Sequence, residues 1–253
     1  MIVGIIPARF ASTRLMGKPL ADIGGKPMIQ HTYESSKTSR LLHEVIIATD
    51  DEKVAEIAKK FGAKVFITPK EILTGSDRIA YVAKQLPDAE IVVNIQGDEP
   101  FIQGIMIDQA IEPLIFDRSV NVATLAKKIE TVEELKSPAV AKVVFDYNNF
   151  ALYFSRSPIP YVREARTMLE RIAVADIYKH IGLYVYRRES LLKFSGLEPT
   201  DLERIEKLEQ LRMLENGFKI KIVVTTYESL SVDTPEDLKQ ARLYYSRLLR
   251  AKE

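Results

Sequence analysis

The sequence predicts an α/β protein with a mostly parallel sheet flanked by helices and an inserted lobe of mixed or antiparallel strands. Short β-branched runs alternate with helical patterns through the first half of the chain, as expected for parallel strands joined by helices. In the second half, a turn-rich segment separates two extended runs, which indicates a hairpin. No repeat, low-complexity segment or long linker interrupts the 253 residues, so we expect one domain that contains this lobe.

Four strands are expected in the first half, each an apolar or β-branched run that ends at turn-forming residues. They cover residues 2–6, 44–49, 64–68 and 90–95. Helices are expected to begin at Pro27, after Asp51 and after Thr74, because a proline or a capping side chain precedes each helical pattern. A further helix is expected near 105–116. The segments that follow the first, second and fourth strands should share one rim, where open parallel sheets bind ligands.

The second half is expected to be less regular, because turns separate several of its strand signals. Extended runs are expected at 121–126, 142–146, 150–155, 180–187 and 219–226. Residues 146–149 are rich in turn formers, which places the hairpin there. One helix is expected at 206–214, and a last one should begin at Pro235 with Asp233 or Thr234 as its N-cap.

Composition and charge exclude several functional classes. Lys and Arg number 36 against 35 Asp and Glu, so the net charge of +1 gives no field that would attract nucleic acid or an anionic membrane. The absence of cysteine excludes disulfides, thiolate metal sites and a cysteine nucleophile. No apolar run approaches the length of a membrane span, and no signal-peptide pattern is present. We therefore expect a cytoplasmic protein that binds neither nucleic acid nor a membrane.

A basic loop after the first strand is the strongest functional signal. It carries Arg9, Arg14 and Lys18 among small residues, and a glycine-containing turn follows before the next helix. Small residues let the backbone approach a ligand, and arginine offers a planar fork that matches phosphate oxygens. A strand, a basic loop and a helix N-terminus together direct donors at an anion. Each residue alone could be a surface charge, but the combination predicts a triphosphate site.

A carboxylate after the fourth strand indicates a Mg²⁺ site. Asp98 follows Gly97 directly beyond that strand, where α/β phosphotransfer enzymes hold Mg²⁺ with one or two carboxylates. Taken alone, Asp98 could form a turn and Asp233 could cap the last helix. The basic loop supports the metal interpretation, because it supplies the polyphosphate that such an ion would need.

Other candidates leave alternatives open. The helix start at 75–78 could bind an anion or could simply be capped by Ser76. Arg156 and His180 lie at strand ends of the inserted lobe and could line a ligand, whereas the 206–214 helix has the pattern of a solvated face. The basic loop matches neither Walker A nor Gly-x-Gly-x-x-Gly, and the chain has no nucleophile elbow and no zinc-binding histidine cluster. P-loop kinases, Rossmann dehydrogenases and hydrolases are therefore not supported.

A series of sequence blocks runs through the whole chain. In order they are IIPARFASTRLMGKPL, ATDDEKVA, TGSDR, NIQGDEP, ALYFSR, HIGLYVYR, EKLEQLRMLENG and VDTPEDL. They closely resemble the 3-deoxy-D-manno-octulosonate cytidylyltransferase (CMP-Kdo synthetase) family. The resemblance implies a Rossmann-like nucleotidyltransferase fold and a Mg²⁺-dependent, usually homodimeric, cytoplasmic enzyme of lipopolysaccharide biosynthesis. One departure is Met16, where family members commonly have proline, so the loop before Lys18 lacks that rigid residue.

The resemblance also implies roles for individual residues. It places Arg9, Arg14 and Lys18 on the CTP phosphates and makes Asp98 and Asp233 the Mg²⁺ ligands, with Lys18, Asp98, Asp233 and Arg9 as the catalytic set. Further residues on the nucleotide side are Ala8, Thr74, Gly75, Ser76, Arg78 and Gln96. Residues on the Kdo side are Arg156, His180, Glu209 and Gln210. Residues 1–126 are then mainly nucleotide-binding, 127–217 form the sugar-binding and dimerisation lobe, and 218–253 are the return strand and C-terminal helix.

The implied reaction converts CTP and Kdo into CMP-Kdo and pyrophosphate. The anomeric hydroxyl of Kdo would attack the α-phosphorus in line, assisted by Mg²⁺, without a protein nucleophile. The carboxylate of Kdo could pair with Arg156 or His180. Two alternatives stay open: a cytidylyltransferase for another acidic sugar, such as 8-amino-Kdo or sialic acid, and a non-catalytic nucleotide-binding protein.

Overall fold

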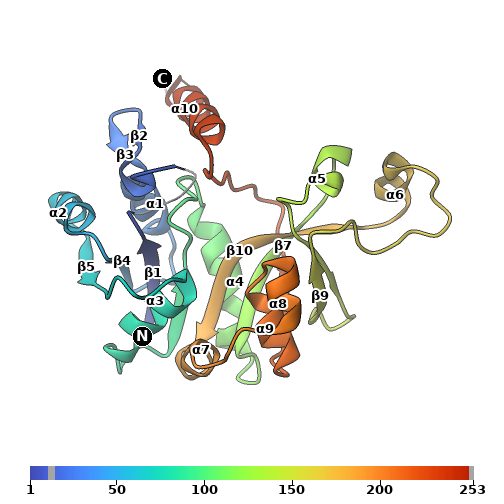
Figure 1. The fold of residues 1–253 in the computed structure, drawn as a ribbon, viewed down its shortest axis with the longest axis horizontal. Helices are drawn as coiled ribbons and strands as arrows, with labels where there is room; N and C mark the ends of the chain where they lie inside the picture. The colour runs from blue at the N-terminus through green and yellow to red at the C-terminus, as the bar shows by residue number, and fades with distance from the viewer. Residues whose placement is uncertain (11–14, 251–253) are drawn as a thin grey trace. The chain divides into compact units, whose positions relative to one another are not determined.

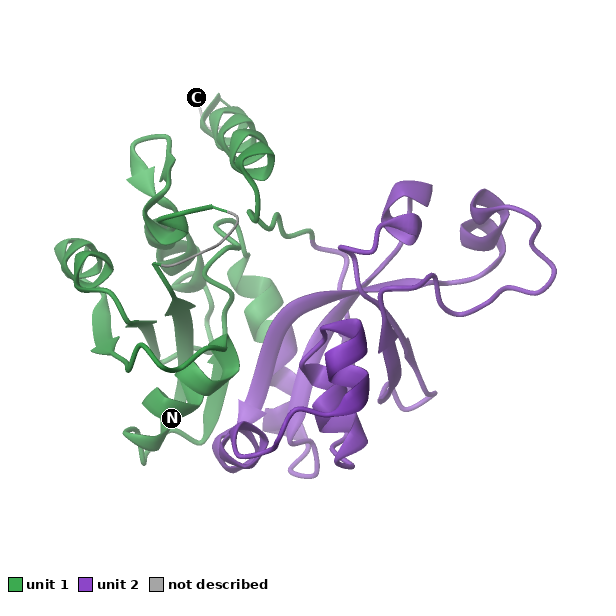
Figure 2. Cartoon of the chain, viewed as in Figure 1, with its two compact units in different colours: residues 1–108, 228–253 green, residues 109–227 purple. Residues whose placement is uncertain are grey.

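The structure, a computed structural model, describes residues 1–10 and 15–250. The chain forms two compact units (Figure 2). Unit 1 comprises Met1–Asp108 and Glu228–Glu253, and unit 2 comprises Gln109–Tyr227. Helix α4 (Gly104–Phe116) contains the boundary between the two ranges. None of the helices in the described residues is both long and apolar enough to span a bilayer.

A parallel sheet with the strand order β6-β1-β4-β5 forms the centre of unit 1 (Figure 1). Its strands are β1 (Ile2–Ala8), β4 (Glu44–Thr49), β5 (Lys64–Ile67) and β6 (Ile91–Asn94). All four confirm predicted strands, and β4 covers the predicted residues 44–49. The apolar side chains of β1, β4 and β6 are buried, which is why these strands are continuous apolar runs in the sequence.

Within the described residues of unit 1, the α-helices that lie wholly inside it are α1 (Met28–Ser36), α2 (Glu52–Lys60), α3 (Gly75–Lys84) and α10 (Pro235–Arg250). Helix α3 packs against β1, β4 and β6, and α2 packs against β4 and β5. The predicted cap of α2 is confirmed, because Asp51 accepts a hydrogen bond from Val54 N at 3.0 Å. The cap of α3 is Thr74, which accepts from Asp77 N at 3.0 Å, so the alternative that Ser76 caps this helix is wrong.

A short two-stranded sheet between β1 and α1 was not predicted. It consists of β2 (Asp22–Ile23) and β3 (Lys26–Pro27) and follows the 3₁₀ helix η1 (Lys18–Leu20). Residues of this segment form one buried cluster with the C-terminal segment: Ile23, Met28, Val232, Leu238 and Ala241. A Cβ at Gly24 would lie 2.4 Å from Tyr245, so the turn between β2 and β3 approaches α10 closely. This packing holds the start of α10 near η1.

A mixed sheet forms the centre of unit 2. Its strands are β7 (Val122–Lys128), β8 (Lys142–Phe145), β9 (Ala151–Ser155), β10 (Tyr178–Arg187) and β11 (Ile220–Val224). Strands β8 and β9 form the predicted antiparallel hairpin, β10 is antiparallel to β7 and β8, and β11 is parallel to β7. Unit 2 is wider than the predicted lobe at 127–217, because β7 and β11 pair within this same sheet.

Five short helices complete unit 2: α5 (Val132–Lys136), α6 (Met168–Val174), α7 (Arg188–Ser195), α8 (Asp201–Glu206) and α9 (Gln210–Glu215). The helix predicted at 206–214 is confirmed in its second part as α9, but its start is wrong, because Lys207, whose φ is 54°, ends α8 and separates it from α9. The solvated-face interpretation is also wrong. Residues 210–213 are buried, and Arg212 stacks on Phe194 at 4.5 Å from the ring centroid.

Candidate active site

Lys18 links two aspartates that lie far apart in the sequence. Its ammonium group donates to Asp98 Oδ2 at 2.6 Å and to Asp233 Oδ1 at 2.8 Å. The Lys18 side chain is 13% exposed, whereas those of Asp98 and Asp233 are 27% and 35% exposed. Because both carboxylates reach the same nitrogen atom, they lie close enough to share one cation. The structure therefore brings together three of the four residues that were predicted as catalytic.

Backbone packing fixes the position of Asp98. A Cβ at Gly97 would lie 2.7 Å from Pro7 O, so only glycine lets the loop after β6 approach the end of β1 this closely. Val232 N donates to Asp98 O at 2.9 Å, which ties the segment before α10 to the same loop. These contacts explain how residues from the first and last parts of unit 1 meet at one point.

Thr234, the second of the two predicted N-cap candidates, caps helix α10. Its Oγ1 accepts from Asp237 N at 3.2 Å. The Asp237 carboxylate accepts from Asp233 N at 3.0 Å and from Thr234 N at 2.8 Å. Burial acts to raise the pKa of Asp237, but these hydrogen bonds outweigh it and lower that pKa. The Thr234 alternative for the N-cap is therefore confirmed, and the carboxylate of Asp233 contacts Lys18.

Glu99, the neighbour of Asp98, is a buried acid that the sequence analysis did not single out. Ser229 Oγ donates to Glu99 Oε2 at 2.9 Å and so anchors the segment before α10 a second time. Burial and then the charge of Asp98 raise the pKa of Glu99 to about 7, although the hydrogen bond from Ser229 opposes the shift. Asp98 therefore lies beside a poorly solvated region, where charge interactions are strong.

The donor set at Asp98 and Asp233 fits Mg²⁺. Two carboxylates are hard oxygen ligands, and a cationic group, the Lys18 ammonium, already contacts both of them. Within residues 1–10 and 15–250, no three His, Cys, Asp or Glu side chains are grouped in a way that could hold a metal. Two protein carboxylates, with the remaining positions left to phosphate and water, are typical of Mg²⁺ sites that bind nucleotides.

Arg9 and Arg78 both approach Asp50 at the end of β4. Arg9 donates from Nη1 to Leu73 O at 2.5 Å, and its Nε lies 3.9 Å from Asp50 Oδ2. The Arg9 side chain is 37% exposed, so it remains accessible to a ligand. Arg78 is fully buried and donates to Asp50 Oδ2 at 2.9 Å and to Ile72 O at 2.8 Å. Arg78 was predicted to line the nucleotide side, but it braces the loop before α3 from inside.

The other predicted nucleotide-side residues lie at the ends of β1 and β6 and at the start of α3. Ala8 is only 2% exposed, so it can offer little more than backbone groups to a ligand. The hydroxyl of Thr74 is used by the cap of α3, and a Cβ at Gly75 would lie 3.4 Å from the Pro7 side chain. Ser76 is buried. Gln96 is partly exposed directly before Gly97. Arg14 lies outside the described residues.

Arg156, predicted for the sugar side, lies just beyond β9 in unit 2. Its guanidinium donates to three backbone carbonyls: Nε to Glu206 O at 2.7 Å, Nη1 to Pro138 O at 2.7 Å and Nη2 to Lys207 O at 3.2 Å. Its backbone N donates to the Glu206 carboxylate at 2.9 Å. These contacts fix the orientation of the guanidinium, and two of its five N–H groups remain for another acceptor.

His180 lies in β10 among aromatic rings. The ring centroids of Phe154 and Tyr184 are 5.2 Å and 5.3 Å away, and His180 Nε2 lies 3.0 Å from Thr124 Oγ1. Although part of its surface is exposed, burial lowers the pKa of His180 to about 3. The ring is therefore neutral near pH 7 in this structure, which favours Arg156 over His180 as the charged partner of a carboxylate.

Tyr184 is buried beside His180, and Gln210, the first residue of α9, is buried as well. Gln210 Nε2 has no hydrogen-bond partner in the described part of the chain. Burial, followed by the charges of Tyr186 and Glu209, raises the pKa of Tyr184 well above its usual value. His180 and Glu209 therefore both lie near Tyr184, which the sequence analysis missed. Its strand was predicted, but period-2 alternation cannot reveal which side chains pack against His180.

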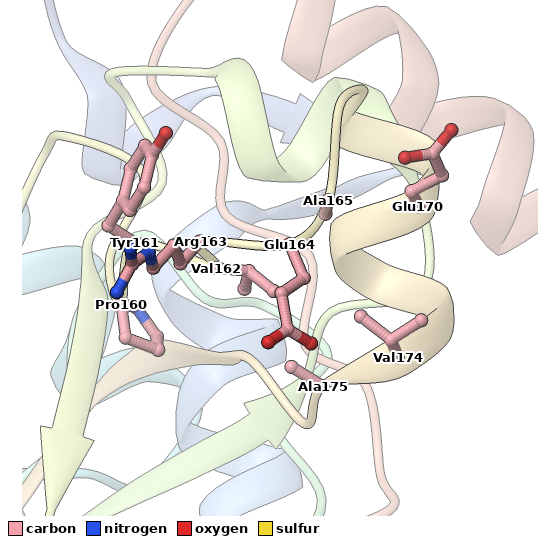
Figure 3. A pocket seen from close by; sticks show the side chains of 9 residues that line it. All are labelled: Pro160, Tyr161, Val162, Arg163, Glu164, Ala165, Glu170, Val174 and Ala175. Atoms are coloured by element: carbon pink, nitrogen blue, oxygen red, sulfur yellow. The ribbon is translucent and has the colours of Figure 1, made fainter.

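A surface hollow of about 720 Å³ lies between the 160–165 loop and helix α6 (Figure 3). Its lining consists of Pro160, Tyr161, Val162, Arg163, Glu164, Ala165, Glu170, Val174 and Ala175. None of the predicted site residues is among them. The hollow therefore does not help to assign the predicted residues.

The chain is similar in sequence and fold to known proteins over most of its length. A family model described as cytidylyltransferase matches residues 3–222. The 3-deoxy-manno-octulosonate cytidylyltransferase of Geotalea uraniireducens is 54% identical over 243 residues, which cover 94% of this chain and 96% of the relative. The protein of the same name from Geobacter sulfurreducens is 51% identical over 243 residues, with coverage of 94% and 97%. The chain belongs to the 3-deoxy-manno-octulosonate cytidylyltransferase family.

A solved structure supports membership of the 3-deoxy-manno-octulosonate cytidylyltransferase family. It is a CMP:2-keto-3-deoxy-manno-octonic acid synthetase complexed with CTP. It matches with a TM-score of 0.90 and 39% identity, over 97% of this chain and 98% of the other. The family and the nucleotidyltransferase fold expected from the sequence are both confirmed.

Proposed function

We propose that this chain transfers CMP from CTP to Kdo and releases pyrophosphate, and that its product serves lipopolysaccharide biosynthesis. The observation that carries the proposal is the shared contact of Lys18 with Asp98 and Asp233, at 2.6 Å and 2.8 Å. A basic group and two carboxylates at one point suit a polyphosphate and its metal. The similarity to named cytidylyltransferases over most of the chain supports the choice of CTP and Kdo.

The reaction requires one bond to form and one to break. The anomeric oxygen of Kdo forms a bond to the α-phosphorus of CTP, the bond from that phosphorus to the bridging oxygen breaks, and the hydroxyl proton passes to solvent. Both substrates are anions, so the protein must neutralise charge and hold them in line. No protein nucleophile takes part.

The basic residues after β1 are proposed to neutralise the triphosphate. Arg9 is accessible at the end of β1, Arg14 follows five positions later in the sequence, and the Lys18 ammonium can move from the two carboxylates to a phosphate oxygen. Asp98 and Asp233 are the proposed Mg²⁺ ligands. When bound, Mg²⁺ neutralises phosphate charge and lowers the pKa of an oxygen that it contacts.

The sugar is proposed to bind to residues of unit 2. Arg156 supplies the charge for the Kdo carboxylate, because its two remaining N–H groups suit a carboxylate and its orientation is already fixed. Neutral His180, Glu209 and Gln210 are proposed to contact sugar hydroxyl groups, and the unpaired Nε2 of buried Gln210 favours such a contact.

The test is pyrophosphate release by the full chain with Mg²⁺, CTP and each acidic sugar in turn. We expect the highest kcat/KM with Kdo. A higher kcat/KM with 8-amino-Kdo or sialic acid would show that this other sugar, and not Kdo, is the preferred substrate. CTP binding without pyrophosphate release with any of these sugars would favour a non-catalytic nucleotide-binding protein. Repeating the assay with the other nucleoside triphosphates tests the preference for cytosine. We also propose that the protein is a cytoplasmic homodimer. Light scattering of the purified chain would test the dimer, because it measures the mass of the particle in solution.

A further inference from the structure

Lys142, the first residue of β8, is a fully buried lysine that the sequence analysis did not single out. Its ammonium group donates to Ser137 O at 2.8 Å, Val140 O at 2.8 Å and Arg156 O at 2.9 Å. An ammonium group has three N–H donors, so all of them are used. Lys142 therefore cannot contact a substrate, and its function must be exerted through the backbone segments that it joins.

Those segments are the ones that orient Arg156. Ser137 and Val140 belong to the loop after α5, and the carbonyl of Pro138 in this loop accepts from Arg156 Nη1 at 2.7 Å. Lys142 thus joins the loop to the backbone of Arg156, and the Arg156 side chain returns to the same loop. Without the ammonium group, three buried carbonyls would lose a charged donor, and the acceptor for Nη1 would no longer be held in place.

The local charge balance supports the same conclusion. Burial and then the charge of Arg156 lower the pKa of Lys142, whereas Glu206 opposes the shift, so all three groups lie near one another. Glu206 is engaged by Ser155 Oγ at 2.6 Å and by Arg156 N at 2.9 Å. Two cations therefore face one carboxylate, and this imbalance favours an anionic ligand at the accessible member of the pair, Arg156.

We propose that Lys142 is a positioning residue that gives the enzyme its affinity for an acidic sugar by holding Arg156 in the orientation that receives the sugar carboxylate. The inference rests on the proposed function, because it assumes that Arg156 binds this carboxylate. The inference predicts that loss of Lys142 weakens binding of the sugar and leaves binding of CTP unchanged. The reason is that Lys142 and Arg156 belong to unit 2, whereas the proposed nucleotide residues belong to unit 1.

The first experiment measures pyrophosphate release by full-length Lys142→Met at varied Kdo and varied CTP. We expect the KM for Kdo to rise at least about tenfold, equivalent to about 1.4 kcal/mol, while kcat and the KM for CTP change less than about threefold. The matched control is Lys136→Met, which removes an exposed lysine next to the same loop and should leave every parameter unchanged. An unchanged KM for Kdo in Lys142→Met, or an equal effect in the control, would overturn the proposal.

A double-mutant cycle tests whether Lys142 acts through Arg156. We expect Arg156→Met to raise the KM for Kdo, and Lys142→Met to add less than about twofold in that background. Effects that multiply would show that the two residues act independently and would refute the inference.

Lys142→Gln is a second variant in case Lys142→Met does not fold. It keeps two N–H donors at this position and removes the charge. It should give a KM for Kdo between those of the wild type and Lys142→Met, and it replaces Lys142→Met in the cycle if the latter is unfolded by circular dichroism. A KM equal to that of the wild type would contradict the role of the charge. If the wild type releases no pyrophosphate from CTP and Kdo, the proposed function fails. If it does so but the cycle is multiplicative, only the present inference fails.

Discussion

Replacing Lys18 with methionine separates its contacts in the free protein from its proposed role on the phosphates. The side chain keeps its approximate length and loses its charge, so the ammonium contacts with Asp98 and Asp233, at 2.6 Å and 2.8 Å, disappear. A hydrogen bond to a charged group is worth about 1.5–3 kcal/mol. If Lys18 moves to a phosphate oxygen in the transition state, a loss of about 2–3 kcal/mol lowers kcat/KM about a hundredfold.

The cost to folding should be much smaller than the cost to catalysis. Asp98 and Asp233 are 27% and 35% exposed, so water can solvate both carboxylates after the ammonium group is removed. The pair interactions are then closer to surface ion pairs, and we expect the free energy of unfolding to fall by about 1 kcal/mol or less. Denaturant unfolding of the variant measures this term separately.

The same variant should bind a divalent cation more tightly when no nucleotide is present. Lys18 and the metal use the same carboxylate oxygens, so removal of the ammonium group removes a competitor for them. Calorimetric titration with Mn²⁺ without CTP measures this effect and does not depend on turnover. The control is Lys26→Met, which removes an exposed lysine whose partner is Glu34 at 2.7 Å. A decrease in kcat/KM below threefold together with unchanged Mn²⁺ affinity would show that Lys18 is only a surface residue.

Three further predictions follow from the structure. Asp98→Asn should abolish turnover while CTP binding largely survives, because one metal-binding charge is lost; near-normal turnover with Mg²⁺ would remove Asp98 from the mechanism. Gly97→Ala should lower both the Tm and the activity, since its Cβ would lie 2.7 Å from Pro7 O, and a melting curve equal to that of the wild type would contradict this packing. The pKa of His180 is lowered to about 3, so its stabilising contribution is complete above its unfolded value of 6.5 and is lost as the pH falls toward 3. His180→Gln should therefore lose less stability between about pH 7 and pH 5, by up to about 2 kcal/mol in urea unfolding, whereas equal losses in both proteins would refute a buried neutral histidine.

Local signals in the sequence were sufficient to predict the strands of unit 1 and the N-cap of α2. The apolar run at 44–49 and the acid after it predicted β4 and the Asp51 cap of α2, and both are confirmed. They succeed because a buried parallel strand and an N-cap each depend on residues within a few positions. The helix predicted at 206–214 starts too early, because Lys207 adopts a left-handed conformation that ends α8 before α9 begins, and helical periodicity does not reveal this.

The candidate site could be predicted only as separate pieces. Lys18 and Asp98 were identifiable because a basic loop and a carboxylate each follow a buried strand. For Asp233 the sequence favoured helix capping, and only the structure revealed its contact with Lys18 across 215 positions and the cap formed by Thr234. Arg78 is a contrasting case. Its place at the start of a helix suggested a contact with the nucleotide, but the structure shows it fully buried and bound to Asp50.

The succession of strands along the first half of the chain, the basic residues after the first strand and the family were determined by the sequence itself, because these features depend on short patterns of neighbouring residues. Which charges meet was decided only by the tertiary structure. Three features depend on desolvation and on contacts between segments that are remote in the sequence. They are the pairing of Lys18 with two distant carboxylates, the neutral state of His180, and the contact of buried Lys142 with the backbone carbonyl of Arg156. Neither burial nor a long-range contact can be read from residue type and spacing, and both set the chemistry of a charged group.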